Sequence, residues 1–170
     1  MKKVFFIAMI TIGAFTTVNA QSTQFSVTGG YVNGNAKVEG FGESESDAQG
    51  GLYLGFAANF SLAEKSSIYT ELAYMNIDDT NFIQLPVLFK YEFADNLSFL
   101  VGPQFTYTAE ESFEELSNFS LGLSVGLGYD FTEKLYGLAR YTQQLNNYYT
   151  GSFDIDATIN FFNVGIGYRF

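Results

Sequence analysis

The chain has 170 residues, a net charge of −10, and no histidine, cysteine or tryptophan. It therefore forms no disulfide, lacks the ligands of a usual zinc or copper site, and lacks the side chain that most often transfers protons near neutral pH. Its acidity disfavours nucleic acid as a partner, and its 15% of charged residues fall below the roughly 25% of ordinary soluble domains.

The first twenty residues have the pattern of a secretory signal peptide. Lysines precede an apolar run from Val4 to Phe15, and small residues end the segment at Ala20. The run is shorter than the ~20 apolar residues that span a bilayer core, so a membrane anchor is the weaker interpretation. We predict a cleaved signal peptide over residues 1–20 and one domain over residues 21–170.

From Phe25 onward the chain divides into segments in which apolar side chains alternate with small or polar ones. In a β-strand, alternate side chains share one face, and about ten tilted residues cross a membrane. We predict eight strands, and their apolar faces begin at Phe25, Leu52, Ile68, Leu85, Leu97, Phe119, Leu135 and Phe162.

The connections between these strands alternate in length. Short ones are predicted at Ser61 to Ser67, Ala94 to Asn96 and Thr132 to Lys134, and long ones at Asn33 to Gly50, Ala109 to Asn118 and Asn146 to Asp156, with a further short one at Asp78 to Asn81. Outer-membrane barrels keep their short turns in the periplasm and their long loops outside. We therefore expect both termini in the periplasm.

Alternation alone does not say which face points outward, because a soluble lipocalin-like barrel alternates with its apolar face inside. The second face of the sixth segment carries small side chains, such as those of Ser120, Gly122 and Ser124. Small side chains suit the narrow interior of an eight-stranded barrel. Aromatic residues also collect near both ends of the apolar faces, as in the two interfacial girdles of membrane barrels. These are Tyr31, Tyr74 and Tyr107 at one end and Phe60, Tyr91, Phe93, Tyr129, Phe131 and Phe170 at the other. The predicted fold is an all-β, eight-stranded antiparallel up-and-down transmembrane β-barrel.

The last segment carries apolar residues at every second position and ends on phenylalanine. Its apolar face consists of Phe162, Val164, Ile166, Tyr168 and Phe170. This pattern resembles the signal by which bacterial barrel assembly machinery recognises its substrates. We predict that machinery as a partner during biogenesis.

Several motifs carry a family resemblance. They are Leu85-Pro86-Val87-Leu88-Phe89-Lys90-Tyr91, Gly102-Pro103, Gly126-x-Gly128-Tyr129, Arg140-Tyr141 and the closing Gly165-x-Gly167-Tyr168-Arg169-Phe170. Together they resemble the porin-like, small outer-membrane β-barrel domain family abundant in Bacteroidetes, which is similar in architecture to the OmpX and OmpA barrels. The resemblance implies residence in the outer membrane of a Gram-negative bacterium, in contact with its lipid. It implies no common catalytic residues.

Charged residues on the second face would point into the lumen. They are Glu71, Lys90, Glu92, Asp130 and Arg140. Because buried charges are costly unless paired, we expect carboxylates and cations to meet there as a plug; the alternative is a movable gate at Lys90 or Arg140. Larger residues would help to fill the lumen, namely Tyr53, Tyr69, Met75, Leu88, Leu100, Tyr136 and Leu138.

Acidic residues crowd the predicted outer loops, with Lys37 as the only basic residue. They are Glu39, Glu43, Glu45, Asp47, Asp78, Asp79, Glu110, Glu111, Glu114, Glu115, Asp154 and Asp156. Such a surface attracts divalent cations and cationic partners. The segment from Glu43 to Asp47 is the best calcium candidate, but it matches no EF-hand pattern, so we predict no metal site and no cofactor.

The predicted function is that of a monomeric, non-enzymatic outer-membrane β-barrel with a structural or interaction role, presenting acidic loops above a polar lumen filled by side chains. The first alternative is a narrow porin-like channel for small solutes or ions. The second is a soluble secreted barrel that binds an apolar ligand.

Overall fold

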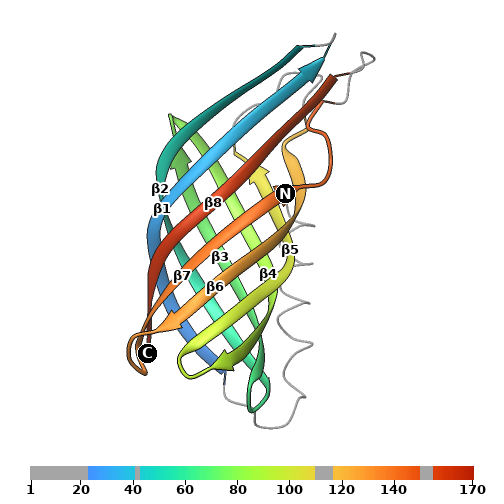
Figure 1. Cartoon of the computed structure of the whole chain (residues 1–170). Coiled ribbons are helices and arrows are strands. Elements are labelled where there is room, and N and C mark those ends of the chain that lie inside the picture. The colour runs from blue at the N-terminus through green and yellow to red at the C-terminus, as the bar shows by residue number, and fades with distance from the viewer. Residues whose placement is uncertain (1–22, 41–42, 110–116, 150–154) are drawn as a thin grey trace, which may run out of the picture.

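The computed structural model describes residues 23–40, 43–109, 117–149 and 155–170, and the predicted signal peptide lies outside these ranges. The described residues form a β-barrel with no helix (Figure 1). Its strands are β1 (Thr23–Gly40), β2 (Glu43–Ala63), β3 (Ser66–Ile77), β4 (Thr80–Ala94), β5 (Leu97–Thr108), β6 (Phe119–Asp130), β7 (Leu135–Gln144) and β8 (Ile155–Arg169). The described residues contain no helix that could span a membrane.

Each strand pairs antiparallel with the next one along the chain, and β8 pairs back with β1, so that the sheet closes. The predicted fold class, an eight-stranded antiparallel barrel in up-and-down order, is confirmed. Closure gives every strand in the barrel wall two neighbours. Its backbone N–H and C=O groups are therefore hydrogen-bonded within the sheet, which matters in a membrane because lipid offers them no partner.

The two ends of the barrel differ. At the end that we call the turn end, tight turns join β2 to β3, β4 to β5 and β6 to β7, and the C-terminus lies beside them (Figure 1). At the opposite end, which we call the loop end, β3 and β4 are joined by Asp78 and Asp79, whose φ angles are 45° and 64°. Positive φ at both central residues is typical of a type I′ turn, which fixes the two strands in a tight hairpin.

One predicted loop is wrong. The segment from Asn33 to Gly50 was expected to be a loop, but β1 continues to Gly40 and β2 begins at Glu43, with an unbroken pairing register between them. Residues 35–40 of β1 also pair with residues 155–160 of β8. The result is a three-stranded sheet, which we call the extension, that rises beyond the other strands at the loop end (Figure 1).

The two faces of the barrel are sharply divided. All eight strands expose large apolar side chains on the outside, such as Leu54, Leu72 and Ile166. All seven residues predicted to fill the lumen are buried. A soluble ligand-binding barrel needs the opposite arrangement, so an apolar exterior of this extent indicates a lipid-facing surface.

Candidate functional site

The interior is bridged at mid-height by a buried ion pair. Arg140 Nη1 of β7 donates to Glu71 Oε2 of β3 at 2.9 Å, and each side chain is only 1% exposed. Thr28 Oγ1 of β1 donates to the other carboxylate oxygen of Glu71. Because β3 and β7 lie opposite each other in the closed eight-stranded order, this pair crosses the whole width of the lumen.

A second polar bridge crosses the lumen beside the first. Asn163 Nδ2 of β8 donates to Gln84 Oε1 of β4 at 3.4 Å, and β4 and β8 are also opposite strands. Arg140 Nη2 reaches the same Gln84 oxygen at 3.5 Å and so links the two bridges. Two crossed bridges between opposite walls leave the middle of an eight-stranded barrel filled by side chains.

A hydroxyl and amide cluster on neighbouring strands completes the interior packing. Ser124 Oγ and Thr142 Oγ1 each donate to Gln104 Oε1 at 3.1 Å. All three residues are buried, and they come from the adjacent strands β5, β6 and β7. The two hydroxyls and the Gln104 side-chain oxygen are hydrogen-bonded within the protein, whereas Gln104 Nε2 has no hydrogen-bond partner among the described residues.

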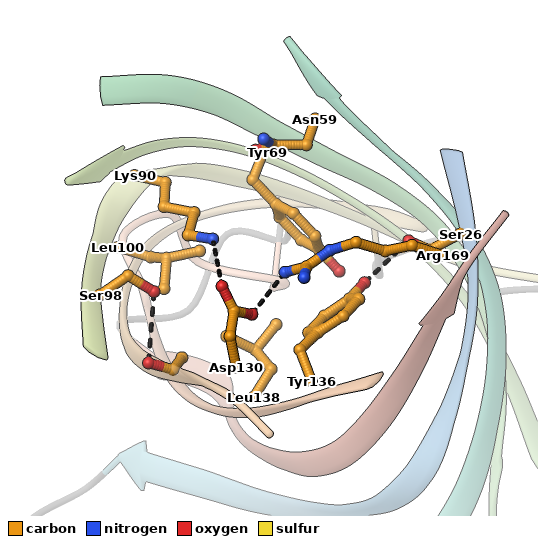
Figure 2. A pocket seen from close by; sticks show the side chains of 11 residues that line it. Ser26, Asn59, Tyr69, Lys90, Ser98, Leu100, Asp130, Tyr136, Leu138 and Arg169 are labelled. Atoms are coloured by element: carbon orange, nitrogen blue, oxygen red, sulfur yellow. Dashed lines mark hydrogen bonds and ion pairs between the residues drawn. The ribbon is translucent and has the colours of Figure 1, made fainter. Parts of the chain in front are cut away.

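The turn end holds a second group of charges (Figure 2). Arg169 Nη2 lies 2.5 Å from Asp130 Oδ1, and Lys90 Nζ lies 3.9 Å from Asp130 Oδ2. The Arg169 guanidinium also stacks 4.5 Å above the ring centre of Tyr136, whose hydroxyl is hydrogen-bonded to Ser26. These ion pairs run from β4 through β6 to β8 and so also reach between opposite walls.

A small cavity lies among these turn-end charges. It has a volume of about 20 Å³, enough for roughly one water molecule. The Asn59 side-chain oxygen, on a residue that lines the cavity, has no hydrogen-bond partner among the described residues. The cavity is too small for a solute larger than water.

The predicted lumen residues thus divide into two groups. Glu71 and Arg140 meet at mid-height, whereas Lys90 and Asp130 meet at the turn end. Glu92 was predicted to face the lumen, but its side chain is 48% exposed and lies 3.8 Å from Lys90, beyond the enclosed interior. The functional role of these residues, as plug or gate, stays a prediction.

Sequence reasoning left Arg169 out of the charge network. The signal was available, because Arg169 shares the inward face of the last strand with Asn163, Gly165 and Gly167. Its distance along the chain from Asp130 concealed the contact, which arises because β8 pairs with β7 and so lies beside the β6–β7 turn. The Arg169 Nη1 hydrogen bond to the Glu133 carbonyl, at 3.2 Å, fixes its position further.

We expect Asp130→Asn to lower the free energy of unfolding by about 1 kcal/mol, because the change leaves Lys90 and Arg169 without their shared carboxylate in a partly exposed site. Urea titration of the refolded barrel measures the effect. Glu92→Gln is the matched control, since Glu92 makes one long ion pair at an exposed position and its loss should cost less. Equal effects from the two variants would contradict the arrangement described for Asp130.

Two glycines of β8 leave room for aromatic rings inside the lumen. A Cβ on Gly165 would lie 2.2 Å from the Tyr53 hydroxyl oxygen, and a Cβ on Gly167 would lie 2.2 Å from Cζ of Tyr136. Both distances are impossible for real atoms, so these tyrosine rings occupy the space that glycine leaves on β8.

The apolar residues of the predicted assembly signal lie on the outside of β8. Phe162, Val164, Ile166, Tyr168 and Phe170 are all exposed. The Phe170 ring lies 6.2 Å from that of Phe56, which stacks on Phe25 with ring centres 5.8 Å apart. The role of these residues in assembly stays a prediction.

The acidic residues of the loop end are only partly described. Glu110, Glu111, Glu114, Glu115 and Asp154 lie outside the described residues, as do the side chains of Glu39 and Glu43. Glu45, Asp47, Asp78, Asp79 and Asp156 are exposed. Among the described residues, no three acidic side chains gather closely enough to suggest a metal site, and the calcium candidate from Glu43 to Asp47 is part of strand β2.

The fold is supported by comparison with solved structures. No protein-family model and no curated protein matches this chain. Neisserial surface protein A matches with a TM-score of 0.53 and 14% identity over 88% of this chain and 100% of that one. Ail, the attachment invasion locus protein of Yersinia pestis, matches with a TM-score of 0.52 and 17% identity over 88% and 99%.

A designed transmembrane β-barrel also matches, with a TM-score of 0.51 and 13% identity over 86% of this chain and 95% of the design. A designed barrel with no natural task has this same architecture, so the architecture by itself implies no activity. The resemblance to a Bacteroidetes family stays a prediction. The chain has the eight-stranded fold of small outer-membrane β-barrels.

Proposed function

We propose that this chain is a non-enzymatic, monomeric outer-membrane β-barrel that acts as a closed scaffold and interacts with its surroundings through its acidic loop end. The observation that carries the proposal is the Arg140–Glu71 ion pair, which joins opposite walls while both side chains are 1% exposed. Water-filled transport needs an open path through that layer. The Gln84–Asn163 bridge obstructs the same layer in the crossing direction.

The orientation that we propose places the turn end and both termini in the periplasm and the extension outside the cell. Support comes from the short turns at one end, as is usual for outer-membrane barrels. The exposed apolar face of β8, ending at Phe170, would serve as the assembly signal at the periplasmic end.

The described loop end favours cations over anions as partners. Ail has been solved with the heparin analogue sucrose octasulfate, which is a polyanion. Here Lys37 is the only basic residue in the described part of the loop end, and Asp47, Asp78 and Asp79 are exposed at the same end. An acidic surface repels a sulfated sugar, so we do not extend that ligand class to this chain.

Planar-bilayer conductance of residues 21–170, refolded in detergent, tests the proposal. We expect electrical silence after insertion, and vesicle flotation verifies independently that the protein has entered the membrane. Steady ohmic steps would contradict the closed scaffold and support the narrow channel instead. In that case Lys90→Ala and Arg140→Ala should alter ion selectivity, because they remove the cations nearest the path.

A further inference from the structure

The loop end contains a cleft that the closed lumen does not use. It has a volume of about 250 Å³, and its large apolar residues are Ile77, Phe82, Ile159 and Phe161. Phe82 and Phe161 pack edge to face with ring centres 5.7 Å apart, and both belong to the buried cluster at this end of the barrel. The cleft therefore has a preformed apolar floor of aromatic and aliphatic side chains.

Two carboxylates border this floor from different elements. Asp47 lies on β2 of the extension, and Asp78 lies in the type I′ turn between β3 and β4. None of the described residues that line the cleft is basic. Both residues are exposed, and Asp47 Oδ2 accepts a hydrogen bond from Gln49 Nε2 at 2.9 Å, so the carboxylates place negative charge at the border of the apolar floor.

A shallow groove continues from the cleft along the extension. It is lined by Ala36, Val38, Glu45, Ser46 and Asp47, and it shares Ala36 and Asp47 with the cleft. The pairing register places Ala36 opposite Asp47 and Val38 opposite Glu45, so apolar and acidic residues run side by side along one face. The whole surface combines an apolar strip with an acidic border.

We propose that this cleft binds a small organic cation with an apolar body, namely an aryl or alkyl ammonium compound. The inference rests on the proposed function in placing the loop end outside the bilayer, and it supplies a ligand class for that end. The ring or chain would cover Phe82 and Phe161, while the ammonium would lie near Asp47 and Asp78. An anion of the same size would meet only repulsion from the two carboxylates.

Tryptamine is a suitable probe, because it is an indole ammonium at pH 7 and the protein contains no tryptophan to interfere with indole fluorescence. Its fluorescence anisotropy is titrated with residues 21–170 refolded in a non-ionic detergent. We expect saturable binding that weakens at high salt, and roughly threefold to tenfold weaker binding of uncharged N-acetyltryptamine. Equal binding of the two compounds would overturn the proposal and indicate partition into detergent.

Substitutions locate the site. Ala36→Phe should abolish binding, because Ala36 lines both the cleft and the groove and a ring there would fill them. Its matched control is Ala48→Phe, on the opposite face of the extension, which should bind as the unaltered protein does. Loss of binding in both variants, or in neither, would overturn the placement of the site.

A second set of substitutions tests the role of the carboxylates. Asp47→Asn combined with Asp78→Asn should weaken tryptamine binding roughly threefold to tenfold, whereas Asp79→Asn, which makes the same change outside the cleft, should leave it unaltered. Asparagine tolerates the positive φ of this turn, so the hairpin is retained. Unchanged affinity in the double variant would contradict the role of the carboxylates.

The two proposals fail separately. Tryptamine binding as expected, together with conductance steps in the bilayer, would contradict the closed scaffold and support the cleft as a binding site. Electrical silence without specific tryptamine binding would support the closed scaffold and contradict the cleft as a binding site.

Discussion

Arg140→Ala should lower the free energy of unfolding by about 3–5 kcal/mol, because it leaves the Glu71 carboxylate buried without its cation. Of the hydrogen bonds described for that carboxylate, only the one from Thr28 Oγ1 would then remain. Urea unfolding of the barrel in lipid vesicles measures the loss. The same variant should remain electrically silent if the residues around it continue to fill the lumen.

The matched control removes both charges together. Glu71→Gln combined with Arg140→Met should be much more stable than Arg140→Ala, since no unpaired charge remains and the lumen stays filled. A loss of less than about 1 kcal/mol for Arg140→Ala would contradict a structural role for the pair. A new leak current in that variant would instead support the gate hypothesis.

Val125→Arg should destabilise the barrel in lipid by about 2–4 kcal/mol. Val125 is exposed on the outer face of β6, near the middle of the strand between Phe119 near the loop end and Tyr129 near the turn end. If those aromatic residues lie at the two interfaces, Val125 faces the centre of the bilayer, where a cation costs most. Urea titration in vesicles gives the difference from the unaltered barrel.

The depth control is Tyr129→Arg on the same strand and the same face. A cation near an interface reaches the headgroups, so this change should cost only about 0–1 kcal/mol. Equal losses from Val125→Arg and Tyr129→Arg would contradict the membrane position assigned to the barrel. Small losses from both would favour the soluble barrel that the sequence left open.

The sequence by itself determined the strands and their faces. An alternation with period two needs only local geometry, because successive side chains of a strand point to opposite sides whatever the strand pairs with. Leu123, Val125 and Leu127 are therefore exposed and Ser120 and Ser124 are buried, as predicted. The same alternation placed Glu71, Lys90 and Arg140 inside, where the structure has them.

The tertiary structure alone decided which inward residues meet. Arg140 reaches Glu71 rather than Asp130 because closure sets β7 opposite β3, and the partners in such contacts depend on the stagger between strands that are far apart in sequence. The contact of Arg169 with Asp130 depends instead on the pairing of β8 with β7, which sets Arg169 beside the β6–β7 turn. No local sequence pattern indicates which of these residues come into contact.

The extension was also decided by tertiary structure. Residues 33–50 contain glycine, serine and acidic residues without a sustained apolar alternation, which in isolation indicates a loop. Their strand conformation comes from backbone pairing that β1 and β2 continue beyond the barrel and that β8 supports from the other side. Backbone hydrogen bonds need no particular side chains, so a sequence pattern could predict the barrel wall but not the sheet that borders the cleft.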